Sequence, residues 1–380
     1  MLALPPLSLY VHIPWCVRKC PYCDFNSHEY SGELPEAKYI DALIDDLTAD
    51  LDQLPSRSLQ SIFIGGGTPS LFSATSLQRL LQRIAALIEF SPTIEITLEA
   101  NPGTAEAKRF AAYREAGINR LSIGVQSFSN LQLQKLGRIH DTTQATAAIS
   151  MARSAGFDNF NIDLMHGLSG QTSAEAMVDL QQAIALEPTH LSWYQLTIEP
   201  NTVFYNRPPP LPADDELDSI QQSGLAMLAE AGFAQYEVSA FAQPGKKSLH
   251  NVNYWQFGDY IGIGAGAHGK LTDPSQDSIV RTRKSRQPAH YLQSSVQRQA
   301  PRQALAREDR ALEFVLNALR LREGFSESLF SARTGLAFSS IAKQVEYLTT
   351  KGLMQSTGGV VTTTDRGYQM LNSVLEEFLS

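Results

Sequence analysis

All three cysteines of the chain lie within one eight-residue segment, from Cys16 through Cys20 to Cys23. An odd number of thiols this close together, with no other cysteine available, cannot form a disulfide framework. Thiolates are soft ligands, so the segment predicts a single metal centre. Structural zinc would need a fourth ligand that no further cysteine supplies, whereas a [4Fe–4S] cluster held by three thiolates leaves one iron open. The alternative is three structural cysteines that happen to lie together.

The spacing of these cysteines resembles a known cluster motif. The pattern C-x3-C-x2-C, with Tyr22 directly before the last cysteine, resembles that of radical S-adenosylmethionine (SAM) enzymes. In that family the open iron chelates the amino and carboxylate groups of SAM, and an electron from the cluster cleaves the sulfonium. The resemblance therefore implies a SAM-capped [4Fe–4S] cluster on this loop.

Composition limits the class of protein. The 380 residues carry a net charge of −8, which gives no electrostatic reason to expect nucleic-acid binding. The first residues have no basic region followed by an apolar core, so we expect no secretory signal. No apolar run approaches the roughly 18–20 residues of a membrane span. With its thiols kept for a metal, we expect the protein in the cytoplasm.

Short apolar runs alternate six times with helix-like segments along the first 200 residues. We expect strands at residues 7–14, 61–64, 93–99, 120–126, 159–165 and 190–198, with helices at 37–51, 75–88, before 116, at 142–154 and at 174–186. Because no hairpin signal separates the strands, the pattern predicts a parallel α/β barrel. Six units predict a partial (β/α)6 barrel whose working face is the carboxyl end of its strands.

Polar residues and glycines recur where these strands end. The sequence Gly-Gly-Gly-Thr at 65–68 has no bulky side chain to keep backbone amides from a ligand. Glu99 and Gln126 end the third and fourth strands, while Asp163 and Thr197 lie in the fifth and sixth. Any one of them could be only a cap or turn residue. Together on one rim they suit a polar ligand that carries ribose, carboxylate and adenine groups.

Several segments resemble one branch of the radical SAM proteins, the oxygen-independent coproporphyrinogen dehydrogenase family. The matching segments are residues 10–16, 65–69, 99–102, 124–128, 163–172, 194–196 and 262–269. The likeness covers nearly the whole chain and implies the radical SAM barrel. It implies contacts to the cluster-bound SAM at Tyr10, Gly66, Gly67, Thr68, Glu99 and Arg138. It also implies a second SAM site at Tyr22, Gln126, Asp163, Thr197 and His268.

Two features separate this sequence from the dehydrogenase itself. The dehydrogenase has a further cysteine two residues after the third, where this chain has Phe25. The string H-N-x-x-Y-W at 250–255 resembles the signature of haem-carrying chaperones within the same family. A neutral imidazole is a standard axial ligand of haem iron, and Tyr254 and Trp255 could pack on a porphyrin face. This resemblance implies a haem chaperone with His250 as the candidate haem ligand.

The resemblance also implies the partners. They are haem itself and haem-accepting proteins, among them membrane-bound respiratory enzymes. The competing hypothesis is an oxygen-independent coproporphyrinogen III dehydrogenase, a radical SAM oxidative decarboxylase. Both share the cluster and SAM residues, so only Phe25 and the string at 250–255 discriminate between them. Without the resemblance, we would expect His250 and its aromatic neighbours to close a surface loop.

Two other features invite a functional interpretation. The glycine-rich run at 262–269 could suggest a dinucleotide site, but that motif must open a helix, and residues 270–274 predict a turn. We expect its glycines to bring the backbone close to the barrel mouth, with His268 either near ligand or simply packed. His140 has no spacing partner, which favours a structural role.

The remainder of the chain predicts two further regions. We divide it into a radical SAM barrel (1–205), an extension with the His250 string (206–300) and a small C-terminal module (301–380). Proline-rich residues 207–212 mark the first boundary. Helices at 306–320, 326–334 and 339–351, a strand pair at 354–362 and a helix at 365–379 predict a winged-helix-like module. This shape does not by itself indicate DNA binding.

The segment from 281 to 322 is strongly basic. It holds ten Lys or Arg residues and only Glu308, Asp309 and Glu313 as acids. A solvated helical face is one explanation. The other is a docking surface for an acidic partner or for anionic lipid, which would place the protein at the inner face of a membrane.

Overall fold

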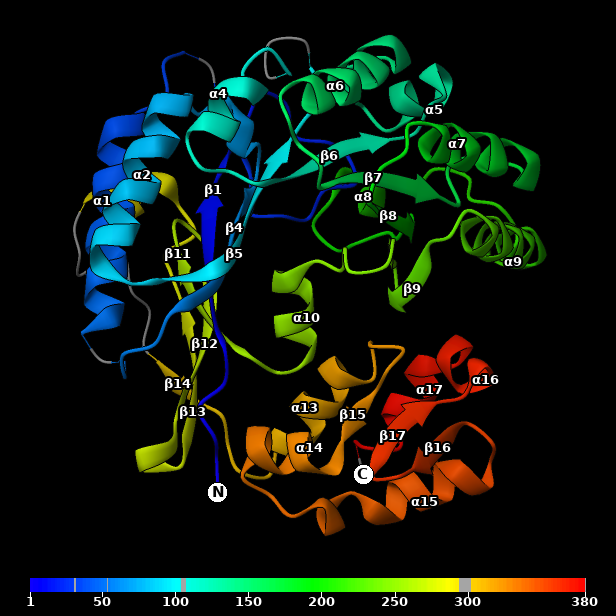
Figure 1. The fold of residues 1–380 in the computed structure, drawn as a ribbon. Coiled ribbons are helices and arrows are strands. Elements are labelled where there is room, and N and C mark those ends of the chain that lie inside the picture. The colour runs from blue at the N-terminus through cyan, green and yellow to red at the C-terminus, as the bar shows by residue number, and fades with distance from the viewer. Residues whose placement is uncertain (31, 53, 104–106, 294–301, 380) are drawn as a thin grey trace.

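One twelve-stranded sheet organises the computed structural model, which describes residues 1–380 apart from 31, 53, 104–106, 294–301 and 380. Within those described residues seven strands run parallel, in the order β11 (Asp259–Ile263), β1 (Leu7–Ile13), β4 (Leu59–Gly66), β5 (Phe90–Ala100), β6 (Arg120–Gln126), β7 (Phe160–His166) and β8 (His190–Gln195). The six predicted strands are confirmed. The seventh, β11, was not predicted, because it follows a long excursion through the extension. Antiparallel strands continue the sheet on both sides, so it stays open (Figure 1).

The antiparallel strands change two details of the prediction. They are β12 (His268–Asp273), β13 (Ser278–Arg283) and β14 (Gln303–Ala304) beyond β11, and β10 (Ala240–Ala242) and β9 (Ala234–Glu237) beyond β8. The β9–β10 hairpin therefore extends the sheet beyond β8. The turn predicted at 270–274 is wrong, since most of it lies in β12. Thr197 follows β8 and does not lie in it, because Leu196 is the last residue whose amide bonds to β7.

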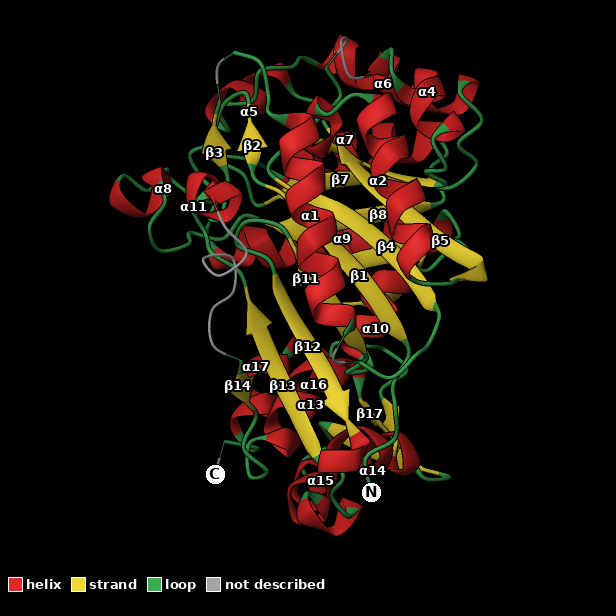
Figure 2. Cartoon of the chain, turned by 90° about the vertical axis from the view of Figure 1, so that its left-hand side faces the viewer, coloured by secondary structure: helices red, strands yellow, loops and turns green. Residues whose placement is uncertain are grey.

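Helices pack around the sheet, most of them on its outer side (Figures 1 and 2). They are α1 (Glu36–Leu51), α2 (Ala74–Leu87), α4 (Phe110–Glu115), α5 (Asn130–Lys135), α6 (Thr142–Ser154), α7 (Ser173–Ala185), α8 (Val203–Asn206), α9 (Asp214–Glu230), α10 (Leu249–Trp255) and α11 (Pro288–Gln293). The amide–side-chain exchange of a capping box begins α6 at Asp141 and α7 at Thr172. Local sequence therefore fixes where these two helices begin, and the predicted bounds agree closely.

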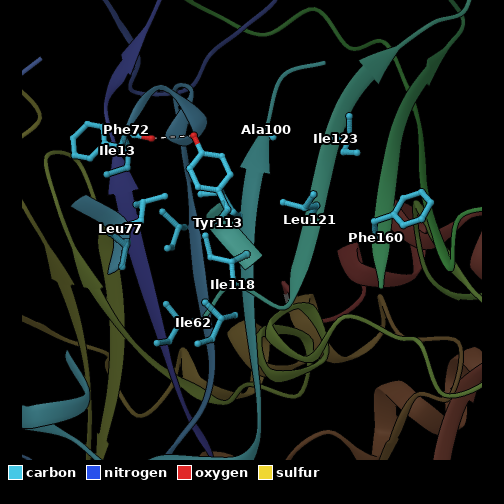
Figure 3. Close-up of a cluster of buried hydrophobic side chains, with 14 of the residues drawn as sticks. Ile13, Ile62, Phe72, Leu77, Ala100, Tyr113, Ile118, Leu121, Ile123 and Phe160 are labelled. Carbon is cyan, nitrogen blue, oxygen red and sulfur yellow. Dashed lines mark hydrogen bonds between the residues drawn. The ribbon is translucent and has the colours of Figure 1, made fainter. Parts of the chain in front are cut away.

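Apolar side chains from strands and helices meet in a continuous core (Figure 3). Ile62 of β4 and Leu121 of β6 are fully buried, as is Leu77 of α2. Burying each such side chain stabilises the fold by roughly 1.5–3 kcal/mol. Tyr113 of α4 is also fully buried, and its hydroxyl donates to the carbonyl of Phe72 at 2.9 Å. This core holds the strands in place so that their carboxyl ends can carry the site.

The C-terminal residues form a small module below the sheet in Figure 1. Its helices are α13 (Arg310–Ala318), α14 (Glu327–Thr334), α15 (Ala342–Thr350), α16 (Asp365–Gln369) and α17 (Leu371–Glu376), around strands β15 (Phe325–Ser326), β17 (Val360–Thr363) and β16 (Met354–Thr357). Helices followed by a hairpin confirm the winged-helix-like prediction, although the last helix is interrupted at Met370. Phe257 and Ile279 of the extension belong to the same core as Phe314. The three-part division of the chain stays a prediction.

Candidate functional site

The cysteine loop is held at the carboxyl end of β1. After Pro14 the chain forms β2 (Trp15–Cys16), which pairs with β3 (His28–Glu29) and closes the loop between them. Cys16 is buried, while Cys20 and Cys23 are half-buried free thiols. The amide of Cys23 donates to the carbonyl of Cys20 at 3.1 Å, which forms a tight turn. The fold thus presents three thiols from one short loop.

The surroundings of these thiols suit a cluster better than a single ion. Burial raises the pKa of Cys16 to about 11 and also raises the pKa of Cys23. A bound metal would reverse this preference by stabilising the thiolates. In the described part of the chain, no three His, Cys, Asp or Glu side chains are grouped to hold one ion. A [4Fe–4S] cluster bonds each thiolate through a different iron, so its ligands need not converge.

The glycine loop after β4 packs against the cysteine loop. A Cβ atom on Gly67 would lie 2.5 Å from the carbonyl oxygen of Trp15, and one on Gly66 would lie 2.7 Å from the His12 ring. The amide of Gly67 donates to Ile13, and that of Thr68 donates to Trp15, both at 2.7 Å. The expectation that these amides are free for a ligand is therefore wrong. The glycines are needed because two backbone segments approach closely here.

A cavity of about 510 Å³, here called the cluster cavity, opens beside the three cysteines. It brings together nine of the eleven predicted SAM residues, namely Tyr22, Gly66, Gly67, Thr68, Glu99, Gln126, Arg138, Asp163 and Thr197. Tyr22 comes from the cysteine loop, and the others come from the glycine loop, from strands β5 to β8 or from segments after them. The C-terminal module adds Arg320 to the lining. The carboxyl ends of the strands thus form the predicted rim.

Two half-buried carboxyl groups in the cluster cavity form no ion pair with a cationic side chain among the described residues. Burial raises the pKa of Glu99 to about 8; the nearby Asp163 adds to the rise, and the Gly66 amide, 3.0 Å from Oε2, opposes it. Burial also raises the pKa of Asp163, although hydrogen bonds from Asn161 (2.7 Å) and Ser122 (3.2 Å) act to lower it. Both groups would be stabilised as carboxylates by a cationic ligand.

Arg138 lies between the cavity wall and the cysteine loop. Its Nη2 donates to Asn101 Oδ1 at 2.6 Å and to the carbonyl of Gly124 at 2.8 Å, and its Nη1 lies 3.6 Å from Cys20 Sγ. Its buried Nε has no partner among the described residues. Asn101 also donates to Thr68 Oγ1 at 3.1 Å. Asn101 is not among the predicted site residues, although it lies two residues after Glu99 in a segment that matches the family.

Gln126 occupies a strained position at the end of β6. Its φ of +74° is in the left-handed region, which is unusual for a residue other than glycine. The hydroxyl of Tyr194 in β8 donates to Gln126 Oε1 at 2.7 Å and fixes the side chain in the cluster cavity. Backbone strain of this kind is typical of functional sites.

A second cavity of about 710 Å³, here called the aromatic cavity, adjoins the first. It contains the two remaining predicted SAM residues, Tyr10 and His268, although the resemblance assigns them to different SAM molecules. Gly66 and Glu99 line both cavities. The structure therefore does not divide the predicted residues into the two implied SAM sets. It separates Tyr10 and His268 from the other nine.

His250 does not line either cavity. It lies in α10, is 6% exposed and stacks on Phe63 with ring centroids 4.2 Å apart. Its Nδ1 lies 3.2 Å from Glu95 Oε1 and 3.0 Å from Ser248 Oγ. Burial lowers the pKa of His250, while Glu95 opposes that shift. The imidazole is thus an interior group beneath the sheet, and the alternative of a surface loop is wrong because α10 is helical and packed.

The rest of the string contributes mostly to packing. Asn253 Nδ2 donates to Ser8 Oγ at 3.0 Å and to the carbonyl of Asp259 at 2.9 Å, which ties α10 to β1 and β11. Tyr254 and Trp255 differ, because both reach the aromatic cavity. The guanidinium of Arg320 lies 4.3 Å from the Trp255 ring centroid. Tyr254 and Trp255, together with Asn251 on the wall of the cluster cavity, bring this motif to the candidate site, whereas the histidine does not.

The other features of the sequence are structural. His140 is buried with Nε2 3.0 Å from the carbonyl of Val125, as expected for a packed histidine. No helix follows the glycine-rich run, which agrees with the rejection of a dinucleotide site. A Cβ atom on Gly266 would lie 2.3 Å from Asn26 of the cysteine loop. This confirms the expected close approach of that backbone to the mouth.

The basic segment is largely neutralised within the protein. Its ion-paired members are Arg281, Lys284, Arg302, Arg307, Arg310, Arg320 and Arg322. Lys284 is buried between Asp46 (2.6 Å) and Asp50 (2.7 Å). Neither a continuous solvated helical face nor a uniformly free basic surface describes this segment. No helix of the described residues is long and apolar enough to cross a membrane.

Comparisons with known proteins agree with this geometry. The family model of the radical SAM superfamily matches residues 10–183, and that of the HemN C-terminal domain matches residues 305–370. The heme chaperone HemW of Haemophilus influenzae is 50% identical over 384 residues, and that of Escherichia coli is 50% identical over 381 residues; each alignment covers all of both chains. The heme chaperone HemW of Bacillus subtilis is 33% identical over 98% of this chain and 99% of its own.

A solved structure shares the whole fold. Coproporphyrinogen III oxidase (HemN) from Escherichia coli, a radical SAM enzyme, superposes with a TM-score of 0.83. The match covers 99% of this chain and 90% of that chain at 24% identity. At that identity the likeness establishes the architecture and leaves the reaction open.

Proposed function

This chain belongs to the HemW family of radical SAM proteins, and from that membership we propose that it binds haem and delivers it to haem proteins. The observation that carries the proposal is 50% identity over the full length of two relatives named heme chaperone. The cluster cavity and the adjoining aromatic cavity offer separate places for a cofactor and a cargo.

We assign the [4Fe–4S] cluster and SAM to the cluster cavity. Cys16, Cys20 and Cys23 would hold the cluster, which when bound supplies an electron and an open iron site. Glu99 and Asp163 provide buried negative charge for the ammonium and sulfonium groups of SAM. The unpartnered Nε of Arg138 is a donor for a carboxylate. The donor set therefore fits both groups.

The dehydrogenase remains the competing function, and one residue argues against it. Phe25 stands where the dehydrogenase motif has its further cysteine, and it lines both cavities with 56% of its surface exposed. An exposed phenylalanine at a cavity mouth suits contact with an apolar molecule better than it suits redox chemistry. The same side chain therefore supports a carrier.

We further propose that the acceptors include membrane-bound respiratory enzymes, which the protein meets from the cytoplasm at the inner face of the membrane. Three cysteines kept as free thiols suit a reducing compartment. The internal ion pairs of the basic segment give little support to docking on anionic lipid by charge alone. Recognition of the acceptor would then depend on shape and apolar contact near the cavity mouth.

Haem transfer tests the proposal. The reconstituted protein is loaded with haem under anaerobic conditions and mixed with a haem-free haemoprotein, with haem-loaded serum albumin as the passive donor. We expect saturable haem binding and faster loading of the acceptor than from albumin. Absence of haem binding, together with oxidative decarboxylation of coproporphyrinogen in the presence of SAM, would establish the dehydrogenase instead.

A further inference from the structure

We propose that haem occupies the aromatic cavity, with His268 as the axial ligand of its iron and Arg283 and Arg286 beside its propionates. This inference rests on the proposed function, because it takes haem as the cargo. It departs from the resemblance, which assigns His268 to SAM and the iron to His250. Four observations support it: the cavity wall, its charge, the state of its histidines and the exposed rim.

The wall of the cavity suits a flat, apolar macrocycle. Seven Phe, Tyr or Trp side chains line it, namely Tyr10, Phe25, Phe63, Tyr254, Trp255, Phe257 and Tyr260. They come from β1, from the cysteine loop, from β4 and from the region of α10 and β11. Aromatic faces and edges stack favourably on other π systems. The cavity volume of about 710 Å³ lies in the range of cofactor and small-molecule sites.

The charge of the cavity favours an anion. Lys270, Arg281 and Arg286 line it, against the acids Asp24 and Glu99. SAM carries a sulfonium, an ammonium and one carboxylate and is therefore a net cation at neutral pH. Haem carries two propionates. The cations of the aromatic cavity suit an anionic cargo, whereas Glu99 and Asp163 in the cluster cavity suit a cationic cofactor.

Two of the arginines are available to propionates. β12 and β13 are paired so that His268 lies opposite Arg283 and Lys270 lies opposite Arg281, which places all four on one face of the hairpin. Lys270 is paired with Asp259 at 2.9 Å, and Arg281 is paired with Glu313. Arg283 and Arg286 are exposed, and no acid among the described residues pairs with either. They flank His268 and are the cations left for a ligand.

The histidines near the cavity differ in their hydrogen bonds. His12 also lines it, but its Nδ1 bonds to Tyr10 at 2.7 Å and its Nε2 lies 2.9 Å from the carbonyl of Asn26. His250 is buried outside both cavities. His268 is exposed, lines the cavity and has no hydrogen-bond partner on its ring among the described residues.

The state of His268 agrees with this role. Burial lowers its pKa, and the charges of Arg283, Arg281 and Arg286 lower it further, so the neutral ring is favoured. A neutral imidazole offers the lone pair that iron needs. The same arginines would thus serve both the iron ligand and the propionates.

Absorption titration with ferric haem tests the iron ligand. We compare the wild-type protein with His268→Ala and with His290→Ala, which removes an exposed histidine of α11 outside both cavities. We expect His268→Ala to weaken binding at least about tenfold and to shift the Soret band. Added imidazole should restore the wild-type spectrum in His268→Ala, which a merely structural role would not allow. His290→Ala should match the wild type.

The propionate contacts are tested with the double variant Arg283→Glu/Arg286→Glu. We expect it to bind protoporphyrin IX less tightly than the wild type does, yet to bind the dimethyl ester as the wild type does, because the ester has no carboxylates. Arg366→Glu, an exposed arginine of the C-terminal module, is the charge control. Equal losses for porphyrin and ester would contradict a propionate role.

The outcomes separate the two proposals. If the wild-type protein binds no haem, the proposed function fails. If it binds haem and transfers it, while His268→Ala and the double arginine variant leave the spectrum and affinity unchanged, haem binds elsewhere and only this inference fails. If His250→Ala alone shifts the Soret band, the iron belongs to α10 and the aromatic cavity is not its site.

Discussion

Glu95 and Glu99 lie four residues apart on the same strand, β5, and both are largely shielded from water, yet their surroundings drive their pKa values in opposite directions. Burial alone would raise the pKa of Glu95, but hydrogen bonds from His250 and the Leu249 amide and the charge of Arg120 lower it to about 2. Burial raises the pKa of Glu99 to about 8, with one amide opposing it. The partners available to each group, more than burial alone, therefore give two different kinds of carboxyl group.

The difference shows which of the two carboxyl groups finds its charged partners within the protein and which does not. Glu95 lies beneath the working face, with partners on β6 and α10. Glu99 lies on the wall of both cavities without a cation among the described residues. A charge removed from water needs a partner. The protein supplies that partner for Glu95, and we expect a ligand to supply it for Glu99.

Removing the charge of Glu95 should have the largest effect on stability. In Glu95→Gln the buried Arg120 loses its carboxylate, and we expect the free energy of unfolding to fall by about 3–5 kcal/mol. Urea unfolding followed by circular dichroism measures it. Glu115→Gln, at an exposed position of α4, should stay within about 0.5 kcal/mol of the wild type. A loss of stability below about 1 kcal/mol in Glu95→Gln would show that the ion pair of Glu95 does not stabilise the fold as we expect.

The matching change at Glu99 should have the opposite sign. Because the pKa of Glu99 is raised in the folded state, its ionisation opposes folding increasingly from about pH 4.5 to about pH 8. Glu99→Gln removes this opposition, and we expect the metal-free protein to gain about 1–3 kcal/mol at pH 8 and less at pH 6. Urea unfolding at the two pH values measures the gain. An equal loss of stability at both pH values would show that Glu99 is a structural residue.

The pH dependence of SAM binding gives a further test of the difference between Glu95 and Glu99. Below about pH 8 Glu99 is mostly protonated, so pairing with a cation must release its proton. We expect the association constant for SAM to rise by up to about tenfold per pH unit between pH 6 and 8 and then to level off. Calorimetry in buffers of different ionisation enthalpy counts the released proton. In Glu99→Gln the dependence should be lost, and a pH dependence that survives there would assign the proton to another group.

The cysteine loop should contribute least to stability. Cys20 is a half-buried thiol on a loop outside the core, so Cys20→Ala should change the free energy of unfolding of the metal-free protein by less than about 1 kcal/mol. Iron and sulfide analysis of the same variant should find no cluster. Loss of cooperative unfolding would show that the barrel depends on this loop.

Much of the fold was predictable because its signals are local. The apolar run at 7–14 and the helix-like segments at 142–154 and 174–186 predict a strand and two helices, which the structure confirms, and Asp141 and Thr172 cap those helices. Strand β11 was missed, since its partner β1 lies far away in the sequence. The order of strands at the sheet edges depends on tertiary pairing that short patterns do not contain.

The site was predictable to the same extent. Glu99, Gln126 and Asp163 could be predicted because carboxyl ends of parallel strands meet on one rim. The burial of His250 could not, because its partner Glu95 lies 155 residues away. Nothing in the local sequence marked Arg286 as a cavity residue either, since its place depends on how β12 and β13 pair.

The affinity of the reconstituted protein for SAM tests the contrast between the two carboxyl groups most directly. It is measured at pH 8 in wild type, Glu99→Gln and Glu95→Gln, with each variant corrected for its folded fraction. The account predicts that Glu99→Gln loses at least about tenfold in affinity, while folded Glu95→Gln binds SAM as the wild type does. Unchanged affinity in Glu99→Gln, or an equal loss in both variants, would contradict it.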